Sequence, residues 1–157
     1  TAILMAGRSG SAFAAELGTM KVNEEIDAIS TMGLRPVRFL ALPRVLAGTL
    51  ALPLLSLFAS FAGLIGGWVV MHILGFSTTY YLDQLTAFVS FGDLVGSLCK
   101  AIVFGFTVSA VGCRCGLQAG SDAGAVGTAT TSAVGASIIL VAALEGIFSV
   151  LFYAMGW

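Results

Sequence analysis

The sequence predicts an all-α, polytopic transmembrane helical bundle with about three full membrane spans and the end of another. The 157 residues are 58% hydrophobic and only 10% charged, with a mean hydropathy of +1.02. A soluble domain carries about 25% charged residues, so this chain lacks the charge to cover a water-exposed surface. It also contains uncharged stretches longer than the ~20 residues that a helix needs to cross a bilayer. Its length favours a single domain.

Charged residues mark the boundaries of the predicted spans. Residues 1–18 are apolar and rich in small side chains, and we predict that they form the end of a span. Positions 45–82 contain no Asp, Glu, Lys or Arg, so one long helix is expected over 45–75, with Pro53 allowing a kink near its start. Two further spans are expected over 94–113 and 133–155.

Basic residues in the connections predict the orientation. The connection before the 45–75 span carries four basic residues, and the connection at 76–93 carries none. The four are Lys21, Arg35, Arg38 and Arg44. Because short cytoplasmic loops are enriched in Lys and Arg, the first connection is expected in the cytoplasm and the second outside. The connection at 114–132 is then cytoplasmic again.

The cytoplasmic connection contains a short, well-specified helix at 23–33. Asn23 is a favourable N-cap, the acidic residues of the first turn complement the helix dipole, and Gly33 is a favourable C-terminal cap. The acidic residues are Glu24, Glu25 and Asp27. Ile26 and Ile29 share an apolar stripe. The helix either docks into a groove of a cytoplasmic partner or lies flat on lipid headgroups. Its acidic first turn favours docking, because the inner leaflet is anionic.

Three charged residues, Arg8, Lys100 and Glu145, fall inside predicted spans. At ~1.5 Å per residue, all three lie roughly 16–20 Å from the cytoplasmic face. Such charges are costly in lipid and normally face protein or water. We therefore hypothesise that Glu145 pairs with Lys100 or Arg8. The pair either only orients the helices or contacts a lipid headgroup. Glu16 lies near the cytoplasmic interface, where it is either solvated or paired with Arg44.

Small residues four apart predict close helix packing in several places. The candidates are Gly63 with Gly67, Gly92 with Gly96, and the series Gly7, Ser11 and Ala15. A further series has the same spacing but runs out of a span into a polar connection, where flexible turn glycines are the expectation. That series is Gly112, Gly116, Gly120 and Gly124.

Several function classes are disfavoured by what the sequence contains. A net charge of −1 excludes nucleic-acid binding driven by bulk charge. There is no Gly-rich phosphate-binding loop followed by Lys, and the only histidine, His72, lies in a span, so an enzyme is not expected. Cys99, Cys113 and Cys115 are interpreted as small packing residues rather than disulfides or metal ligands. No metal site and no directly bound cofactor are expected.

Two long stretches resemble the signature of the MlaE/YrbE permeases, the membrane subunits of ABC transporters that work with MCE proteins. They are AGRSGSA at 6–12 and AELGTMKVNEEIDA at 15–28. The resemblance continues over most of the chain. It includes 32–33, 36–38, 43–44, 52–53, 100–105 and 129–134.

The resemblance implies a lipid-transport machine. Two permease copies form a homodimer in the bacterial inner membrane, with a cytoplasmic ABC ATPase, possibly with a STAS-domain protein, below and a periplasmic MCE-domain protein above. Phospholipids or related lipids move between the inner membrane and the outer envelope. The partner ATPase uses the ATP, and the permease is not catalytic. The 23–33 segment corresponds to the coupling helix, so Glu24, Glu25, Ile26 and Asp27 are implied to contact the ATPase.

The family also carries an Arg-Glu-x-Gly-Pro motif, an interfacial helix and a first span ahead of the point that matches Thr1. The expectation is therefore that residues 1–157 are the C-terminal part of a single MlaE-type permease domain. The alternatives are a channel or secondary transporter that uses the intramembrane charges itself, and a membrane anchor for a cytoplasmic protein.

Overall fold

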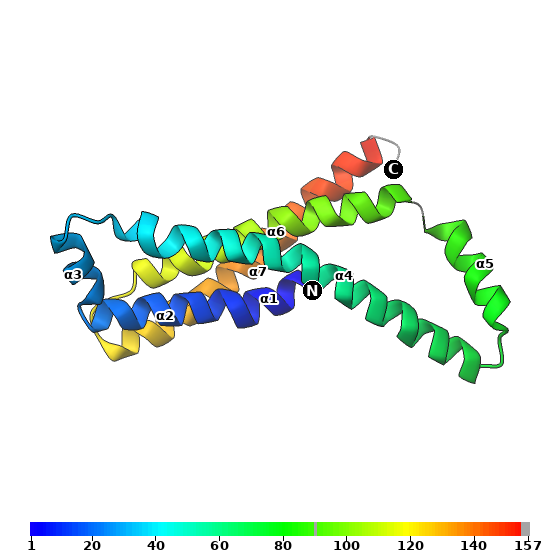
Figure 1. Ribbon diagram of the computed structural model, residues 1–157, viewed down its shortest axis with the longest axis horizontal. Coiled ribbons are helices and arrows are strands. Elements are labelled where there is room, and N and C mark those ends of the chain that lie inside the picture. The colour runs from blue at the N-terminus through cyan, green and yellow to red at the C-terminus, as the bar shows by residue number, and fades with distance from the viewer. Residues whose placement is uncertain (90, 155–157) are drawn as a thin grey trace.

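The computed structural model describes residues 1–89 and 91–154, and all of the regular secondary structure in these residues is helical. The first part of the chain is a run of helix from Ala2 to Val22. It comprises α1 (Ala2–Met5), the π-helical turn η1 (Ala6–Gly10) and α2 (Ser11–Val22). The short helix α3 (Glu25–Thr31) follows at one end of the molecule (Figure 1).

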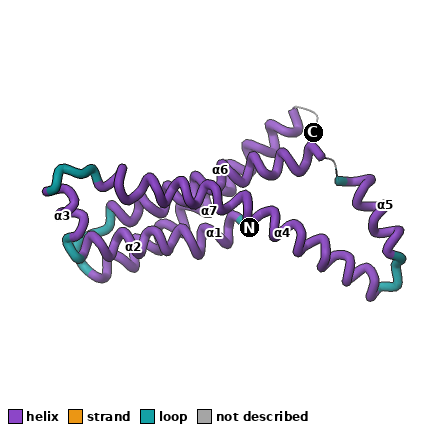
Figure 2. The backbone as a smooth tube through the Cα atoms, viewed as in Figure 1, coloured by secondary structure: helices purple, strands orange, loops and turns teal. Residues whose placement is uncertain are grey.

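Three longer helices complete the chain. A second π-helical turn, η2 (Val37–Ala41), leads directly into α4 (Leu42–Ile73), and α6 (Phe91–Leu117) and α7 (Ala123–Ala154) follow. Between α4 and α6 lies α5 (Thr78–Phe88). Only short loops separate the helices (Figure 2). Within the described residues, three helices are long and apolar enough to cross a membrane: Val37–Ile73, Gly92–Leu117 and Ala123–Ala154. The predicted all-α membrane bundle is confirmed.

The central helix of the bundle is α6, which packs against α4, α2 and α7. Its closest contacts are made at glycines. A Cβ on Gly105 would lie 2.8 Å from the carbonyl oxygen of Gly48 on α4, and one on Gly112 would lie 2.5 Å from that of Gly10. A Cβ on Gly116 would lie 2.8 Å from the carbonyl oxygen of Ala14. These backbones therefore approach too closely for any larger residue.

The close-packing glycines agree only in part with the predicted ones. Gly7 and Gly63 have no atoms within 4 Å of a built Cβ, whereas a Cβ on Gly67 would lie 3.1 Å from the Tyr81 hydroxyl and one on Gly96 would lie 3.4 Å from the Phe152 ring. Gly112 and Gly116, predicted as turn glycines, lie inside α6 at its tightest contacts, so that prediction was wrong for them. Gly116 is helical because α6 continues to Leu117, beyond the expected end at 113, and Gly112 lies inside the expected span itself. Only Gly120 of that series lies in the loop, since Gly124 is the second residue of α7.

The structure also draws the span boundaries differently. The helix predicted over 45–75 starts at Val37, and the helix predicted over 133–155 starts at Ala123, where Asp122 accepts a hydrogen bond from the backbone N–H of Ala125 at 3.1 Å. The predicted end at Met155 lies outside the described residues. The polar 114–132 connection is thus mostly helical. Its Ser, Thr and Gly residues extend the ends of α6 and α7, and these helices are stabilised by the packing of their apolar parts in the bundle.

The far half of α4 diverges from the bundle, and α5 returns the chain from its tip towards α6 (Figure 1). The Tyr81 hydroxyl donates to the carbonyl oxygen of Leu64 at 2.8 Å, and Trp68 Nε1 donates to Thr78 Oγ1 at 3.3 Å. These bonds attach α5 to the outer half of α4. The sequence predicted only an external connection here.

Candidate functional site

The predicted docking helix forms a separate element at the basic end of the bundle. The chain leaves α2 at Val22 and reverses through Glu24, which has a left-handed backbone with φ 60°. Asn23 is not the N-cap that the sequence predicted. Its side-chain amide instead donates to Glu25 Oε1 at 3.3 Å, while α3 begins at Glu25. The tight reversal places Asn23 at the end of α2, where it cannot cap α3.

The other end of α3 follows the prediction. Gly33 has φ +78°, a conformation that favours glycine, and its N–H donates to the carbonyl oxygen of Ser30 at 3.0 Å. The N–H of Leu34 reaches the carbonyl oxygen of Ile29 at 3.3 Å, which completes a Schellman-type end. Because both ends are defined, α3 is a short rigid rod rather than a loop.

The two faces of α3 differ in chemistry. Glu24, Glu25 and Asp27 are exposed, whereas Ile26 is only 9% exposed. Ile26 belongs to an apolar cluster with Leu17 of α2, Leu40 and Ala41 of η2, and Cys113 of α6. Ile29 packs on the same cluster. The apolar side of α3 is therefore buried in a cluster that includes residues of α2, η2 and α6, whereas its acidic side is exposed.

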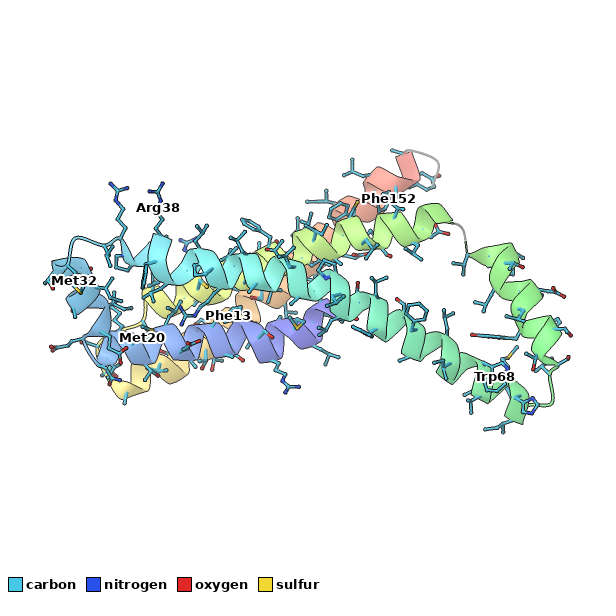
Figure 3. All side chains as sticks on the ribbon, viewed as in Figure 1. Phe13, Met20, Met32, Arg38, Trp68 and Phe152 are labelled. Atoms are coloured by element: carbon cyan, nitrogen blue, oxygen red, sulfur yellow. The ribbon has the colours of Figure 1, made fainter. Side chains whose placement is uncertain are left out.

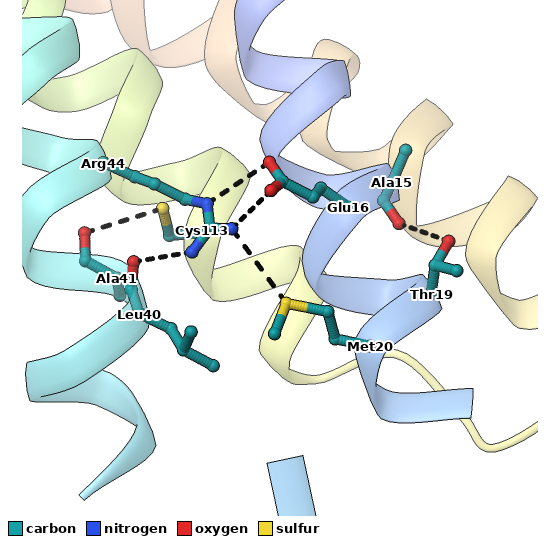
Figure 4. A network of polar contacts seen from close by, with 8 residues as sticks. All are labelled: Ala15, Glu16, Thr19, Met20, Leu40, Ala41, Arg44 and Cys113. Atoms are coloured by element: carbon teal, nitrogen blue, oxygen red, sulfur yellow. Dashed lines mark hydrogen bonds and ion pairs between the residues drawn. The ribbon is translucent and has the colours of Figure 1, made fainter. Parts of the chain in front are cut away.

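A charged contact joins the two helices that flank α3. Arg44, in the first turn of α4, forms a two-bond ion pair with Glu16 of α2, and its Nη1 also donates to the carbonyl oxygen of Leu40 at 2.9 Å (Figure 4). Elsewhere α2 and α4 pack mainly on α6 rather than on each other. Lys21 adds a bond from α2 to α6, with Nζ 3.1 Å from the carbonyl oxygen of Leu117. Polar contacts thus join α2 to α4 and to α6 at the end of the bundle where α3 lies.

The structure brings together two of the three intramembrane charges. Lys100 Nζ of α6 lies 2.9 Å from Glu145 Oε1 of α7. Lys100 Nζ also lies 5.0 Å from the centre of the Phe152 ring, a cation–π distance that the sequence did not indicate. Of the two partners considered for Glu145, the structure thus places Lys100 beside it. Arg8 is exposed in η1 and makes no ion pair with the described residues.

Two cavities open beside these residues. One of about 510 Å³ has Lys100 and Glu145 in its wall together with apolar side chains of α4, α6 and α7, including Leu52, Phe104 and Val141. Another, of about 620 Å³, lies between the middle of α4 and the start of α6, with Phe61, Leu64 and Leu94 in its wall. Their sizes fall in the range of about 300–1,000 Å³ typical of small-ligand pockets. Both are predominantly apolar with few polar groups.

The described residues offer no site for a metal ion. No group of three or more His, Cys, Asp or Glu side chains comes together among them. The three cysteines are free, and they range from buried Cys113 to exposed Cys99.

These features define a class of protein. The chain has three helices that can cross a membrane, the short helix α3 at the basic end, and apolar cavities in the bundle. This combination is typical of a multi-pass membrane transport component. The family described as Permease MlaE matches residues 1–151. The chain belongs to this permease family, as the resemblance predicted.

Individual relatives agree with the family. A probable ABC transporter permease protein of Rickettsia typhi is 41% identical over 140 residues, which cover 88% of this chain and 54% of the relative. One from Synechocystis is 39% identical over 142 residues, or 90% of this chain and 54% of the relative. The chloroplastic protein TRIGALACTOSYLDIACYLGLYCEROL 1 of Arabidopsis thaliana is 36% identical over 98% of this chain and 44% of its own length. The chain thus spans about half the length of these relatives.

Proposed function

We propose that this chain belongs to the permease subunit of an ABC transporter that moves phospholipids or related lipids between the inner membrane and the outer envelope. A separate cytoplasmic ATPase supplies the energy, and the permease itself carries out no catalysis and binds no cofactor. The observation that carries the proposal is the geometry of α3. Its acidic side is exposed, and its apolar side is buried in the cluster that joins α2, η2 and α6.

The lipid substrate is supported by the cavities and by one relative. Apolar walls suit acyl chains, and the Lys100–Glu145 pair at the edge of the 510 Å³ cavity supplies charges that could meet a headgroup. The name of the Arabidopsis relative includes that of a galactolipid, trigalactosyldiacylglycerol. A homodimer in the bacterial inner membrane, with a periplasmic MCE-domain protein and a STAS-domain protein as further partners, completes the proposed assembly.

The proposed mechanism transmits motion through α3. When ATP closes the ATPase pair, the exposed Glu24, Glu25 and Asp27 move with the groove that holds them, and Ile26, buried on the other side of the same helix, moves with them. Ile26 and Ile29 then press on Leu17 and Leu40, and the feet of α2 and α4 shift together. Because α4 and α6 border the lipid cavities, this shift changes the shape of the cavities.

Charge reversal on α3 tests this function. The triple variant Glu24→Lys, Glu25→Lys, Asp27→Lys in the full permease should still insert in the membrane, because these side chains are exposed. It should lose co-purification of the ATPase and lipid transfer between labelled vesicles. Asp83→Lys, an exposed acid on α5, serves as the control and should leave both unchanged. Full lipid transfer by the triple variant would refute the coupling role.

A further inference from the structure

A basic and apolar hollow lies beside α3, where the chain turns into η2. It has a volume of about 400 Å³ and is lined by Gly33, Leu34, Arg35, Arg38 and Phe39. The left-handed Gly33 turns the chain, and the N–H groups of Arg38 and Phe39 both bond to the carbonyl oxygen of Arg35, at 3.0 and 3.1 Å. This local structure brings two guanidinium groups to the same hollow.

Neither guanidinium is neutralised within the described part of the chain. The ion pairs found there are Arg44–Glu16 and Lys100–Glu145, and they involve neither Arg35 nor Arg38. Arg38 extends sideways from the bundle, whereas Met32 lies at its tip with α3 (Figure 3). Arg38 therefore points towards what surrounds the bundle laterally. The acidic residues of α3 lie at the end of the bundle instead.

The apolar surface next to Arg38 continues along the spanning helix. Val37 and Phe39 are 64% and 59% exposed. Leu42 and Leu46 follow Arg38 at intervals of four residues and are also exposed. An exposed leucine stripe on a membrane-crossing helix meets acyl chains, so a cation one turn beyond the stripe lies at headgroup level.

We propose that Arg35 and Arg38 bind the phosphate of an anionic phospholipid in the cytoplasmic leaflet, while Val37 and Phe39 insert among its acyl chains. Guanidinium groups match the geometry of phosphate oxygens and bind them with charge-assisted hydrogen bonds. The cytoplasmic leaflet is the anionic one, and the basic connections place this end of the bundle there. This lipid is a fixed ligand at the foot of α4 and is distinct from any lipid in the Lys100–Glu145 cavity.

The site has a mechanical consequence that rests on the proposed function. The bound headgroup holds η2 at the membrane surface, while α3 follows the ATPase. The last residue of α3, Thr31, lies only six residues before the start of η2 at Val37. Transport should then depend on anionic lipid even when the transported lipid is neutral. Lipid binding itself does not depend on transport, so the two proposals fail separately.

The experiment uses the full permease in nanodiscs of phosphatidylcholine that contain a minor fraction of photoactivatable phosphatidylglycerol. Cross-links mapped by mass spectrometry should fall within residues 33–39. Arg35→Gln and Arg38→Gln should each reduce the preference for phosphatidylglycerol over phosphatidylcholine about 5-fold, and the double variant roughly 30-fold, since each cation near an anionic surface contributes about equally. Arg114→Gln, which removes an exposed cation near the same end on α6, is the matched control and should leave cross-linking at 33–39 unchanged.

Three outcomes would overturn the proposal. One is an unchanged lipid preference in the double variant with the protein correctly inserted. The other is protection of Arg35 and Arg38 from arginine-modifying reagents only when the ATPase is bound, which would assign the surface to a protein partner. Competition by inorganic phosphate at concentrations that leave the bilayer intact would likewise indicate a free-anion site rather than a lipid site.

Discussion

At the scale of single residues, the chain concentrates its polar contacts at two levels of the bundle. Glu16 and Arg44 lie near α3, and Lys100 and Glu145 lie beside an apolar cavity. Both pairs join helices that are distant in sequence. The exposed fractions of the two pairs are similar, at 19% for Arg44 and 58% for Glu16 against 21% for Lys100 and 51% for Glu145. The pairs differ in their surroundings, because Glu16 and Arg44 lie near the polar end of the bundle, whereas Lys100 and Glu145 lie within helices that are apolar enough to cross a membrane. The same change of charge should therefore have different consequences.

Removal of the Glu145 carboxylate should show how much the free energy of unfolding falls when Lys100 has no ion-pair partner. We expect Glu145→Gln to destabilise the protein by about 2–3 kcal/mol, because Lys100 keeps a charge without a partner inside the span. Glu145→Asp retains the charge and should behave nearly as wild type. The double variant Lys100→Met, Glu145→Leu should be milder than Glu145→Gln. Thermal unfolding in nanodiscs measures this, and a Glu145→Gln protein that is stable and transports normally would contradict an essential pairing.

The Glu16–Arg44 pair should respond differently to removal of each partner. Glu16→Gln should cost about 0.5–1 kcal/mol, since the carboxylate is partly solvated. Arg44→Ala should cost about 1 kcal/mol more, because the bond to the Leu40 carbonyl oxygen is lost as well. Arg44→Lys should lie between them, as a single ammonium cannot form both bonds to the carboxylate. Equal effects of Glu16→Gln and Arg44→Ala in chemical denaturation would show that the Leu40 bond contributes nothing.

At the scale of elements, the glycines of α6 decide how closely three helices approach. Gly105, Gly112 and Gly116 face backbone atoms of α4, η1 and α2, respectively, so an added methyl group has no flexible neighbour to displace. Sequence spacing alone did not identify these contacts. The i, i+4 pattern of small residues occurs at several places in this glycine-rich chain, and only the packing shows which of them face another helix.

Alanine substitution should separate contact glycines from open ones. Gly112→Ala should destabilise the bundle by about 1–3 kcal/mol, because the methyl group meets the Gly10 carbonyl oxygen at 2.5 Å. Gly63→Ala has open space around it and should stabilise α4 by up to about 1 kcal/mol through helix propensity. Melting temperatures of the two variants in the same detergent provide the comparison. Destabilisation by both would indicate that Gly63 contacts a surface absent from this chain's own fold.

At the scale of the whole molecule, the bundle is tight around α3 and open at the opposite end. Close contacts among α2, α4, α6 and α7 hold the first part, while the outer half of α4 and α5 project away from it (Figure 1). Many large apolar side chains in this projecting part are exposed, among them Phe58, Phe61 and Phe88. Such exposure is compatible with lipid or further protein around this end.

The attachment of α5 to α4 should be weak and local. Tyr81→Phe removes the bond to the Leu64 carbonyl oxygen and should cost about 0.5–1.5 kcal/mol in local opening. Amide hydrogen exchange should therefore accelerate in α5, with little change in α6. Tyr80→Phe, a neighbouring exposed tyrosine, is the control. Faster exchange throughout the bundle would mean that α5 stabilises the whole fold rather than its own segment.

Composition and residue order determined the class and the existence of α3, and the orientation that they predict stays a prediction. Long uncharged stretches specify spans wherever they lie, and Gly33 together with the first-turn acids specifies a helix through local backbone preferences. The ATPase-coupling role of Glu24, Glu25, Ile26 and Asp27 stays a prediction. Only the tertiary structure decided that Lys100 rather than Arg8 lies beside Glu145, that Gly112 is a contact, and that Asn23 ends α2 instead of capping α3. The reason is that ion pairs and close backbone contacts depend on which helices pack against each other. Helices that are distant in sequence become neighbours only when the whole bundle has formed.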